Sequence, residues 1–309
     1  MKIVYMGTPD FAVPALTALC EAGYDVALVV TKPDRPRDRG KKLQSCPVKL
    51  EALKRGLPVA TPDRLKDNGD FFARVRQIAP DLIVVAAYGK ILPKALLDMP
   101  KRGCVNIHGS LLPSYRGAAP IHRAVADGCG RTGVTLMYMA EGMDTGDIIA
   151  AAETEVGPKT TEQLHEELAR LGADLLIRHL PAILEGSAGR RPQDPEKATY
   201  APMISREEAL IDFSLPADKI CAQVRGMYSW PCAWTRYGDR VMKIHEAVPG
   251  SAGDSPEPGT VVRADREGIA VACSGGTVIL KRIQMPGKKA MDAGEYLLGN
   301  KIEIGAVLR

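Results

Sequence analysis

The sequence Leu82-Ile83-Val84-Val85-Ala86-Ala87 is a continuous apolar run. Such a run is expected for a β-strand that is covered on both faces, as strands of parallel sheets are. Shorter apolar runs at residues 3–6, 26–31 and 104–107 alternate with helical patterns such as residues 11–22. This alternation of strand and helix predicts an α/β fold with a doubly wound, mostly parallel sheet.

The same pattern continues to the end of the first half of the chain. Residues 134–139 and 148–154 read as strands, and residues 160–184 read as a helix whose leucines recur on one face. Thr160 and Gln163 have the spacing of a capping box at the start of this helix. Ligands of such sheets bind beyond the carboxyl ends of the strands, so residues that follow the strands are the candidates for a site.

The second half of the chain has a different character. Residues 187–205 are rich in Gly, Pro, Arg and polar side chains, which predicts a linker between a first domain, residues 1–186, and a second, residues 206–309. A helix is expected at residues 217–227, followed by short strands between Gly and Pro turns, a pattern typical of a small antiparallel barrel. These strands are expected at residues 233–237, 241–247, 260–264, 269–272 and 277–284.

Composition indicates an ordinary globular protein, with 45% hydrophobic and 25% charged residues among 309. Aromatic residues make up 5%, which argues against broad stacking on single-stranded nucleic acid. No apolar run is long enough for a membrane helix, and the N-terminus reads as a strand rather than a signal peptide. We therefore expect a cytoplasmic protein without membrane contact.

Metal and dinucleotide chemistry are not expected. The 7 cysteines are scattered without a Cys-x-x-Cys pair, which suggests reduced thiols, and no His-Glu-x-x-His motif occurs. The turn after the first expected strand, Gly7-Thr8-Pro9-Asp10, has a single glycine where dinucleotide-binding proteins have Gly-x-Gly-x-x-Gly. That turn argues against the use of NAD.

Two segments together supply an amide, an imidazole and a carboxylate. Asn106 and His108 are two residues apart at a strand end, so their side chains are expected on the same side, and Asp144 lies in a Gly-rich turn. An amide N–H can bind a developing oxyanion, an imidazole can shuttle a proton, and a carboxylate can orient the imidazole. This set suits transfer of an acyl group to an amine. Ser110 lacks a Gly-x-Ser-x-Gly elbow, so we do not expect it to be a nucleophile.

From Lys2 to about Met291 the chain resembles the methionyl-tRNA formyltransferase family. Motifs of the first domain mark the wider superfamily of 10-formyltetrahydrofolate-dependent formyltransferases, and the basic loop and the second half narrow the resemblance to the tRNA enzymes. The motifs that carry it are Met6-Gly7-Thr8-Pro9-Asp10-Phe11, Arg39-Gly40-Lys41-Lys42, Ala87-Tyr88-Gly89, Asn106-Ile107-His108-Gly109-Ser110-Leu111-Leu112-Pro113, Gly142-Met143-Asp144-Thr145-Gly146-Asp147 and Trp230-Pro231.

The resemblance implies a Rossmann-like catalytic domain followed by a small OB-like β-barrel domain. It implies direct transfer of a formyl group from 10-formyltetrahydrofolate to the α-amino group of methionyl initiator tRNA, without a covalent enzyme intermediate or a metal. Asn106, His108 and Asp144 would be the catalytic residues. The folate co-substrate would contact Tyr88, Gly89, Ser110, Leu111, Leu112 and Pro113.

Net charge is only +4, but basic residues are concentrated between Lys32 and Lys42 and again after Lys281. The first cluster resembles the insertion loop of the family, which enters the acceptor end of the tRNA, and Arg39 matches its key arginine. Contacts to phosphates would make tRNA affinity depend on salt. The residues assigned to tRNA binding are Arg35, Arg37, Arg39, Lys41, Lys42, Lys281, Lys288 and Lys289. A monomer is expected.

Four alternatives remain open at this point. A sugar-nucleotide formyltransferase would share the three catalytic residues but would not require the basic loop. A glycinamide ribonucleotide formyltransferase would not need the second domain, and a hydrolase of formyl-folate would use water in place of the amine. A tRNA- or folate-binding protein without activity would not need intact Asn106, His108 and Asp144.

Overall fold

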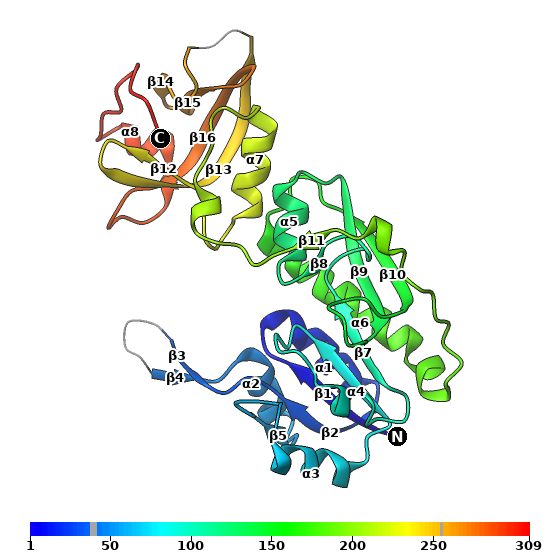
Figure 1. The fold of residues 1–309 in the computed structure, drawn as a ribbon. Coiled ribbons are helices and arrows are strands. Elements are labelled where there is room, and N and C mark those ends of the chain that lie inside the picture. The colour runs from blue at the N-terminus through cyan, green and yellow to red at the C-terminus, as the bar shows by residue number, and fades with distance from the viewer. Residues whose placement is uncertain (38–41, 254–255) are drawn as a thin grey trace. The chain divides into compact units, whose positions relative to one another are not determined.

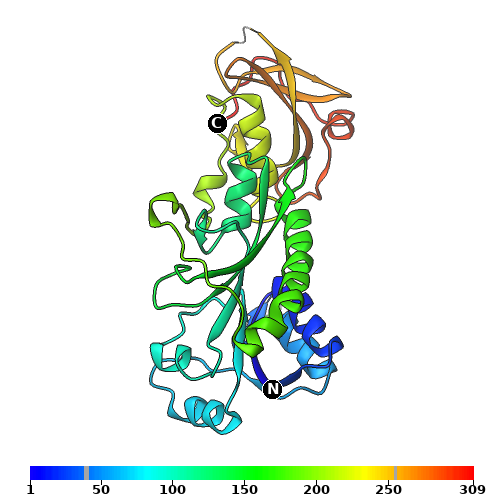
Figure 2. The same cartoon turned by 90° about the vertical axis from the view of Figure 1, so that its right-hand side faces the viewer.

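A computed structural model of the chain describes residues 1–37, 42–253 and 256–309. The chain forms two compact units (Figures 1 and 2). No helix of the described residues has both the length and the apolar character needed to cross a membrane. Unit 1 comprises residues 1–120, 132–154 and 165–201, and unit 2 comprises residues 121–131, 155–164 and 202–309.

Unit 1 is built on a 7-stranded sheet with the order β10-β9-β7-β6-β1-β2-β5. Neighbouring strands from β5 to β7 pair in parallel, and β9 pairs antiparallel with β7. The predicted mostly parallel sheet is therefore confirmed. The strands are Lys2–Gly7 (β1), Asp25–Val30 (β2), Val59–Ala60 (β5), Leu82–Ala86 (β6), Cys104–His108 (β7), Arg131–Tyr138 (β9) and Ile148–Glu155 (β10).

Helices lie on both faces of this sheet, as a doubly wound fold requires (Figure 2). On one face, alternate strand residues such as Val4 and Ile83 share a buried cluster with Phe71 of α3. On the other, α6 approaches so closely that a Cβ at Gly172 would lie 2.6 Å from Cγ2 of Ile107. The helices are Val13–Glu21 (α1), Pro47–Lys54 (α2), Gly69–Ile78 (α3), Lys94–Leu97 (α4) and Thr161–Glu185 (α6).

The start of α6 confirms the predicted capping box. The N–H of Thr160 donates to Oε1 of Gln163 at 3.0 Å, and the N–H of Gln163 donates to Oγ1 of Thr160 at 3.3 Å. These two bonds satisfy backbone donors that the first turn of a helix leaves unpaired.

Part of the segment that the sequence indicates as a linker packs within unit 1. Arg191 and Ile148 exchange backbone hydrogen bonds of 2.8 and 3.0 Å. Tyr200–Ala201 (β11) pairs in parallel with Arg116–Gly117 (β8), close to the end of β7 in the sequence. Residues 187–201 are thus held by specific contacts, and the chain returns to unit 2 at Pro202.

Unit 2 contains a sheet with the order β12-β13-β16-β15-β14, and neighbouring strands of this sheet pair antiparallel. This confirms the predicted small antiparallel domain. Gly226 at the end of α7 lies so close to α5 that a Cβ there would be 2.6 Å from Cα of Ala126. The elements are Pro120–Ala126 (α5), Ala217–Gly226 (α7), Trp234–Tyr237 (β12), Arg240–Ala252 (β13), Val261–Asp265 (β14), Gly268–Cys273 (β15), Gly276–Gln284 (β16), Met291–Asp292 (β17) and Ala293–Leu297 (α8).

The strand order of unit 1 reverses direction between β1 and β6. β2 lies on one side of β1 and β6 on the other, so the connections leave β1 and β6 toward opposite edges of the sheet. Crevices beyond the carboxyl ends of strands at such a switch point are the usual ligand sites of α/β sheets. Gly7, Ala86 and His108 end β1, β6 and β7 at this edge.

Candidate active site

Two side chains that could take part in a reaction, Asn106 and His108, lie at the carboxyl end of β7. His108 is the last residue of the strand and Asn106 lies two residues earlier, so both side chains project to the same side of the sheet. Their exposed fractions are only 6% and 9%. Hydrogen bonds and charges at this position are therefore weakly screened by water.

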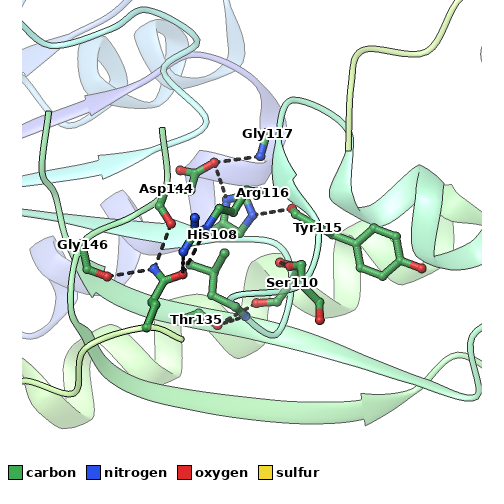
Figure 3. Close-up of polar contacts among 11 residues, drawn as sticks. His108, Ser110, Tyr115, Arg116, Gly117, Thr135, Asp144 and Gly146 are labelled. Atoms are coloured by element: carbon green, nitrogen blue, oxygen red, sulfur yellow. Dashed lines mark hydrogen bonds and ion pairs between the residues drawn. The ribbon is translucent and has the colours of Figure 1, made fainter. Parts of the chain in front are cut away.

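Both ring nitrogens of His108 face oxygen acceptors. Nε2 lies 2.9 Å from the carbonyl oxygen of Tyr115, and Nδ1 lies 3.7 Å from Oδ2 of Asp144 (Figure 3). A carbonyl can only accept, so Nε2 carries the proton in the neutral tautomer, and Nδ1 then presents a lone pair to the carboxylate. Only the imidazolium satisfies both contacts, so this geometry suits a histidine that takes up a proton during a reaction.

Asp144 is held in a tight turn between β9 and β10. Its φ of 52° lies in the left-handed region, which Asp tolerates better than most residues. Its Oδ2 accepts the backbone N–H of Gly117 at 2.9 Å. A Cβ at Gly146 would lie 1.8 Å from the carbonyl oxygen of Tyr138, so only glycine fits there. The turn therefore fixes the carboxylate beside His108.

The carboxamide of Asn106 is a candidate hydrogen-bond donor at the end of β7. Among the residues that the structure describes, it has no hydrogen-bond partner, although the residue is 9% exposed. A nearly buried amide donor without a partner is costly unless a ligand or water completes it. Asn106 can thus donate an N–H to an oxygen bound at the end of β7.

The turn after His108 is stabilised by its own polar groups (Figure 3). Oγ of Ser110 donates to the carbonyl of Ser114 at 2.6 Å. Thr135 Oγ1 donates to the carbonyl of Ser110 at 2.7 Å and accepts the N–H of Leu112 at 3.0 Å. Ser110 is fully buried. The structure thus places Ser110 to Pro113 beside His108, with the Ser110 hydroxyl committed to the turn.

Tyr88 and Gly89 follow β6 at the same edge of the sheet. The Tyr88 side chain belongs to the core cluster, and burial raises its pKa to about 12. Its hydroxyl has no hydrogen-bond partner in the described part of the chain. Ala87 and Gly89 have φ values of 44° and 69°, so the backbone turns sharply here. Because the Tyr88 side chain is buried in the core, a ligand at this position would contact the main chain of Tyr88.

Gln193 and Arg116 make hydrogen bonds at the Asp144 turn that the sequence does not reveal. Nε2 of Gln193 donates to the carbonyls of Asp144 and Gly146, both at 2.8 Å, and its Oε1 accepts from Arg116. Gln193 lies in the segment that reads as a linker, and no motif marks it. Arg116 could be suspected only from its place near the His108 motif.

The structure gives no indication of a metal site. Within residues 1–37, 42–253 and 256–309, no group of three or more His, Cys, Asp or Glu side chains is placed to hold a metal ion.

The basic segment after β2 contains a short β-ribbon. Arg35–Arg37 (β3) and Lys42–Gln44 (β4) pair antiparallel, with Arg37 opposite Lys42. The sequence predicts a loop throughout, so the ribbon is an element that it misses. Arg39 and Lys41 lie outside the described residues, and nothing is described of the side chains of Arg35, Arg37 and Lys42.

Asp34 fixes the base of this ribbon. Its Oδ2 accepts from Nζ of Lys49 on α2 at 2.7 Å and from Oγ of Ser45 at 3.2 Å, so the two ends of the ribbon and the helix are joined at one carboxylate. The hydrogen bond from Lys49 lowers the pKa of the Asp34 carboxyl below its usual range.

Replacing Asp34 with asparagine should lower the free energy of unfolding near neutral pH. Because the folded pKa is lowered, the carboxylate stabilises the fold above its unfolded pKa of about 4, and this contribution is lost as the pH falls through the folded value. Urea unfolding of wild type and D34N at a series of pH values measures the difference, with D239N in an exposed turn as the control. If the difference in free energy of unfolding between wild type and D34N grew toward acid pH, the stabilising role of the Asp34 carboxylate would be contradicted.

The basic residues predicted in the second domain lie on unit 2. Lys281 is on β16, and its Nζ donates to the carbonyl of Glu267 at 2.7 Å. Lys288 and Lys289 are exposed in the turn that follows β16. Arg282 is also exposed, so basic residues follow one another along β16 and its turn in the sequence.

Two family models match the chain. The formyl transferase model matches residues 1–180, and the model of the formyl transferase C-terminal domain matches residues 203–301. The first match covers Asn106 and His108 at the end of β7 and Asp144 in its turn. The second match covers the antiparallel sheet of unit 2.

Relatives of known name are similar over the whole chain. A methionyl-tRNA formyltransferase of Moorella thermoacetica is 48% identical, over 100% of this chain and 99% of the relative. One of Clostridium acetobutylicum is 44% identical over 100% of both chains. Among solved structures, the N-formyltransferase from Helicobacter canadensis in complex with folinic acid and dTDP-3-aminofucose has a TM-score of 0.67 at 18% identity, over 92% of this chain and 99% of that one. This last similarity shows a shared fold.

Proposed function

The chain belongs to the methionyl-tRNA formyltransferase family, and from this we propose that it transfers a formyl group from 10-formyltetrahydrofolate to the α-amino group of methionyl initiator tRNA. The observation that carries the proposal is the similarity to the tRNA enzymes over the full chain, together with the grouping of an amide, a histidine and a carboxylate near the end of β7. We further propose that the enzyme acts as a monomer in the cytoplasm, for translation initiation.

Asn106 supplies the stabilisation of charge in this reaction. The methionyl amine attacks the formyl carbon, a C–N bond forms, and the carbonyl electrons move onto the formyl oxygen. The side-chain N–H of Asn106 donates to that oxygen as the tetrahedral intermediate forms. A donor fixed on a strand and shielded from water needs little reorganisation, which is why such groups contribute strongly.

His108 and Asp144 carry the proton in the second half of the reaction. When the intermediate collapses, the carbonyl reforms, the bond from the formyl carbon to N10 of the folate breaks, and N10 leaves with a proton. His108 gives up this proton as an imidazolium, and the carboxylate 3.7 Å from its Nδ1 favours the charged ring and fixes its orientation. The amine loses its proton to His108, to Asp144 or to water.

The surroundings of the site fit a folate. Folates present a flat heterocycle with many donors and acceptors, which suits turned main chain at Ala87 to Gly89 and the buried turn at Ser110 to Pro113. Ile91 and Met143 are 81% and 60% exposed on the loops after β6 and β9, so they offer apolar surface to a flat ring. The solved Helicobacter canadensis structure holds folinic acid, a formylated folate.

The basic ribbon and the surface along β16 would hold the tRNA. A small acceptor does not require either cluster, whereas a polyanion gains affinity from both. Residues proposed to contact tRNA are Arg35, Arg37, Arg39, Lys41, Lys42, Lys281, Lys288 and Lys289.

Replacing Arg39 with alanine should raise the KM for tRNA and leave the KM for the folate unchanged. Loss of one phosphate contact lowers the slope of log affinity against log salt by about 1. Steady-state formylation at several salt concentrations measures both effects, and Arg76→Ala, which removes an exposed arginine of α3, is the control. If the slope of log affinity against log salt were the same in R39A as in wild type, Arg39 would be excluded from the residues that contact tRNA.

A second function is a sugar-nucleotide formyltransferase, which the shared fold with the Helicobacter canadensis enzyme favours. The deciding experiment supplies 10-formyltetrahydrofolate with three acceptors in parallel: charged initiator tRNA, elongator methionyl-tRNA and a UDP-amino sugar. Formylation of the initiator tRNA alone supports the proposal. Activity on the sugar alone would reject it, and release of formate without any acceptor would indicate a hydrolase.

A further inference from the structure

Gln193 connects a buried arginine to the turn that carries Asp144. Its Oε1 accepts from Nε and Nη2 of Arg116 at 3.1 and 2.7 Å. Its Nε2 donates to the carbonyls of Asp144 and Gly146, each at 2.8 Å. One side chain therefore bridges Arg116 and both ends of the Asp144 to Gly146 turn.

The orientation of the Gln193 amide is determined by its partners. Arginine can only donate and the two carbonyls can only accept, so the oxygen must face Arg116 and the nitrogen must face the turn. Arg116 is 5% exposed and forms no ion pair with the described part of the chain. A buried guanidinium is costly without polar partners, so Gln193 is held firmly in this orientation.

The same segment also supports the carbonyl that contacts His108. Oγ1 of Thr199 accepts the N–H of Tyr115 at 2.8 Å, and the carbonyl of Thr199 accepts the N–H of Arg116 at 2.8 Å. Tyr115 has a φ of 59°, so its backbone conformation depends on such contacts. Residues 193–199 thus hold the groups on both sides of the His108 ring.

We propose that Gln193 is a positioning residue for the formyl transfer reaction. By binding the carbonyls of Asp144 and Gly146, it holds the Asp144 carboxylate against Gly117 and His108. The inference rests on the proposed function, because it takes Asp144 as part of the catalytic machinery. The segment between the two domains then supplies a residue that supports the active site, in addition to connecting the domains.

The Gln193→Glu variant distinguishes a role in positioning Asp144 from a role in stabilising the fold. The glutamate keeps an acceptor for Arg116 and gives that buried cation a carboxylate, so the melting temperature should stay at or above that of wild type. The second carboxylate oxygen cannot donate to the carbonyls of Asp144 and Gly146 and repels them, so the turn should shift. A displacement of about 1 Å can cost 10²-fold in rate, so we expect kcat to fall about 10- to 100-fold while both KM values change less than about threefold.

Steady-state kinetics and thermal melting of the full chain test this, with exposed Glu196→Gln as the control from the same segment. A crystal structure of Q193E should show Oδ2 of Asp144 moved away from the N–H of Gly117, a contact of 2.9 Å in the wild type. Wild-type kcat in Q193E, or an unmoved Asp144, would overturn the inference. A loss of kcat only in proportion to a lowered melting temperature would also overturn it. Failure of wild type to formylate tRNA would reject the proposed function, and the position of Asp144 would still decide the role of Gln193.

Discussion

Replacing Asn106 with alanine is expected to lower kcat for formyl transfer by about 10²–10³-fold, the usual cost of losing one oxyanion donor. The carboxamide has no partner in the described residues, so its removal breaks no hydrogen bond of the folded protein. The loss should appear in kcat, because the donor acts on charge that develops only as the intermediate forms. The KM values for folate and tRNA should change little.

Asn106→Asp is a stricter test than Asn106→Ala, because it preserves the size of the side chain and removes the N–H donor. An ionised aspartate offers no N–H and places a negative charge where the oxyanion must develop, so it should be at least as inactive as N106A. Single-turnover formylation with saturating folate measures the chemical step, and circular dichroism melting checks the fold. Retention of more than about a third of the wild-type rate in both variants would exclude Asn106 as the oxyanion donor.

Much of the fold could be predicted because its signals are local. The run at Leu82 predicted β6, the leucine periodicity predicted α6, and Thr160 with Gln163 predicted the hydrogen bonds at its start. A strand that is covered on both faces needs apolar residues throughout, and a helix with one buried face needs them every third or fourth position. Such requirements are met within a short stretch of sequence.

The contacts around the site were harder to predict from the sequence, because they join residues far apart in the chain. The place of Asn106 and His108 followed from the end of β7, but the bridge from Arg116 to Asp144 through Gln193 depends on how residues 190–201 return to unit 1. A Pro- and Gly-rich segment predicts irregular backbone whether it is free or packed. Composition therefore could not show that this segment carries a residue of the site.

The antiparallel ribbon in the basic segment was missed for a different reason. Pro36 and the surrounding charges are unfavourable for strands, so local propensity indicates a loop. The structure joins both ends of the ribbon to α2 through Asp34, and this closure brings β3 and β4 into register. Tertiary anchoring here overrides the preference of the sequence.

Replacing Asp144 with asparagine is expected to lower kcat by about 10²–10⁴-fold, the range for loss of general acid–base function. The asparagine oxygen can still accept the N–H of Gly117, so the turn should keep its shape. What disappears is the negative charge 3.7 Å from Nδ1 of His108. Without that charge the imidazolium is no longer favoured, and the leaving N10 of the folate lacks its proton donor.

Asp147→Asn provides the matched control, since Asp147 lies in the same turn but pairs with Arg190 at 3.6 Å instead of with His108. The two variants remove the same charge within three residues of each other, so a general electrostatic effect would affect both. We expect D147N to stay within about threefold of wild type while D144N loses its activity. Equal losses in the two variants would mean that the charge of the turn matters as a whole. Activity of D144N near the wild-type level would leave His108 to act without a carboxylate partner, and the mechanism proposed for proton transfer would be wrong.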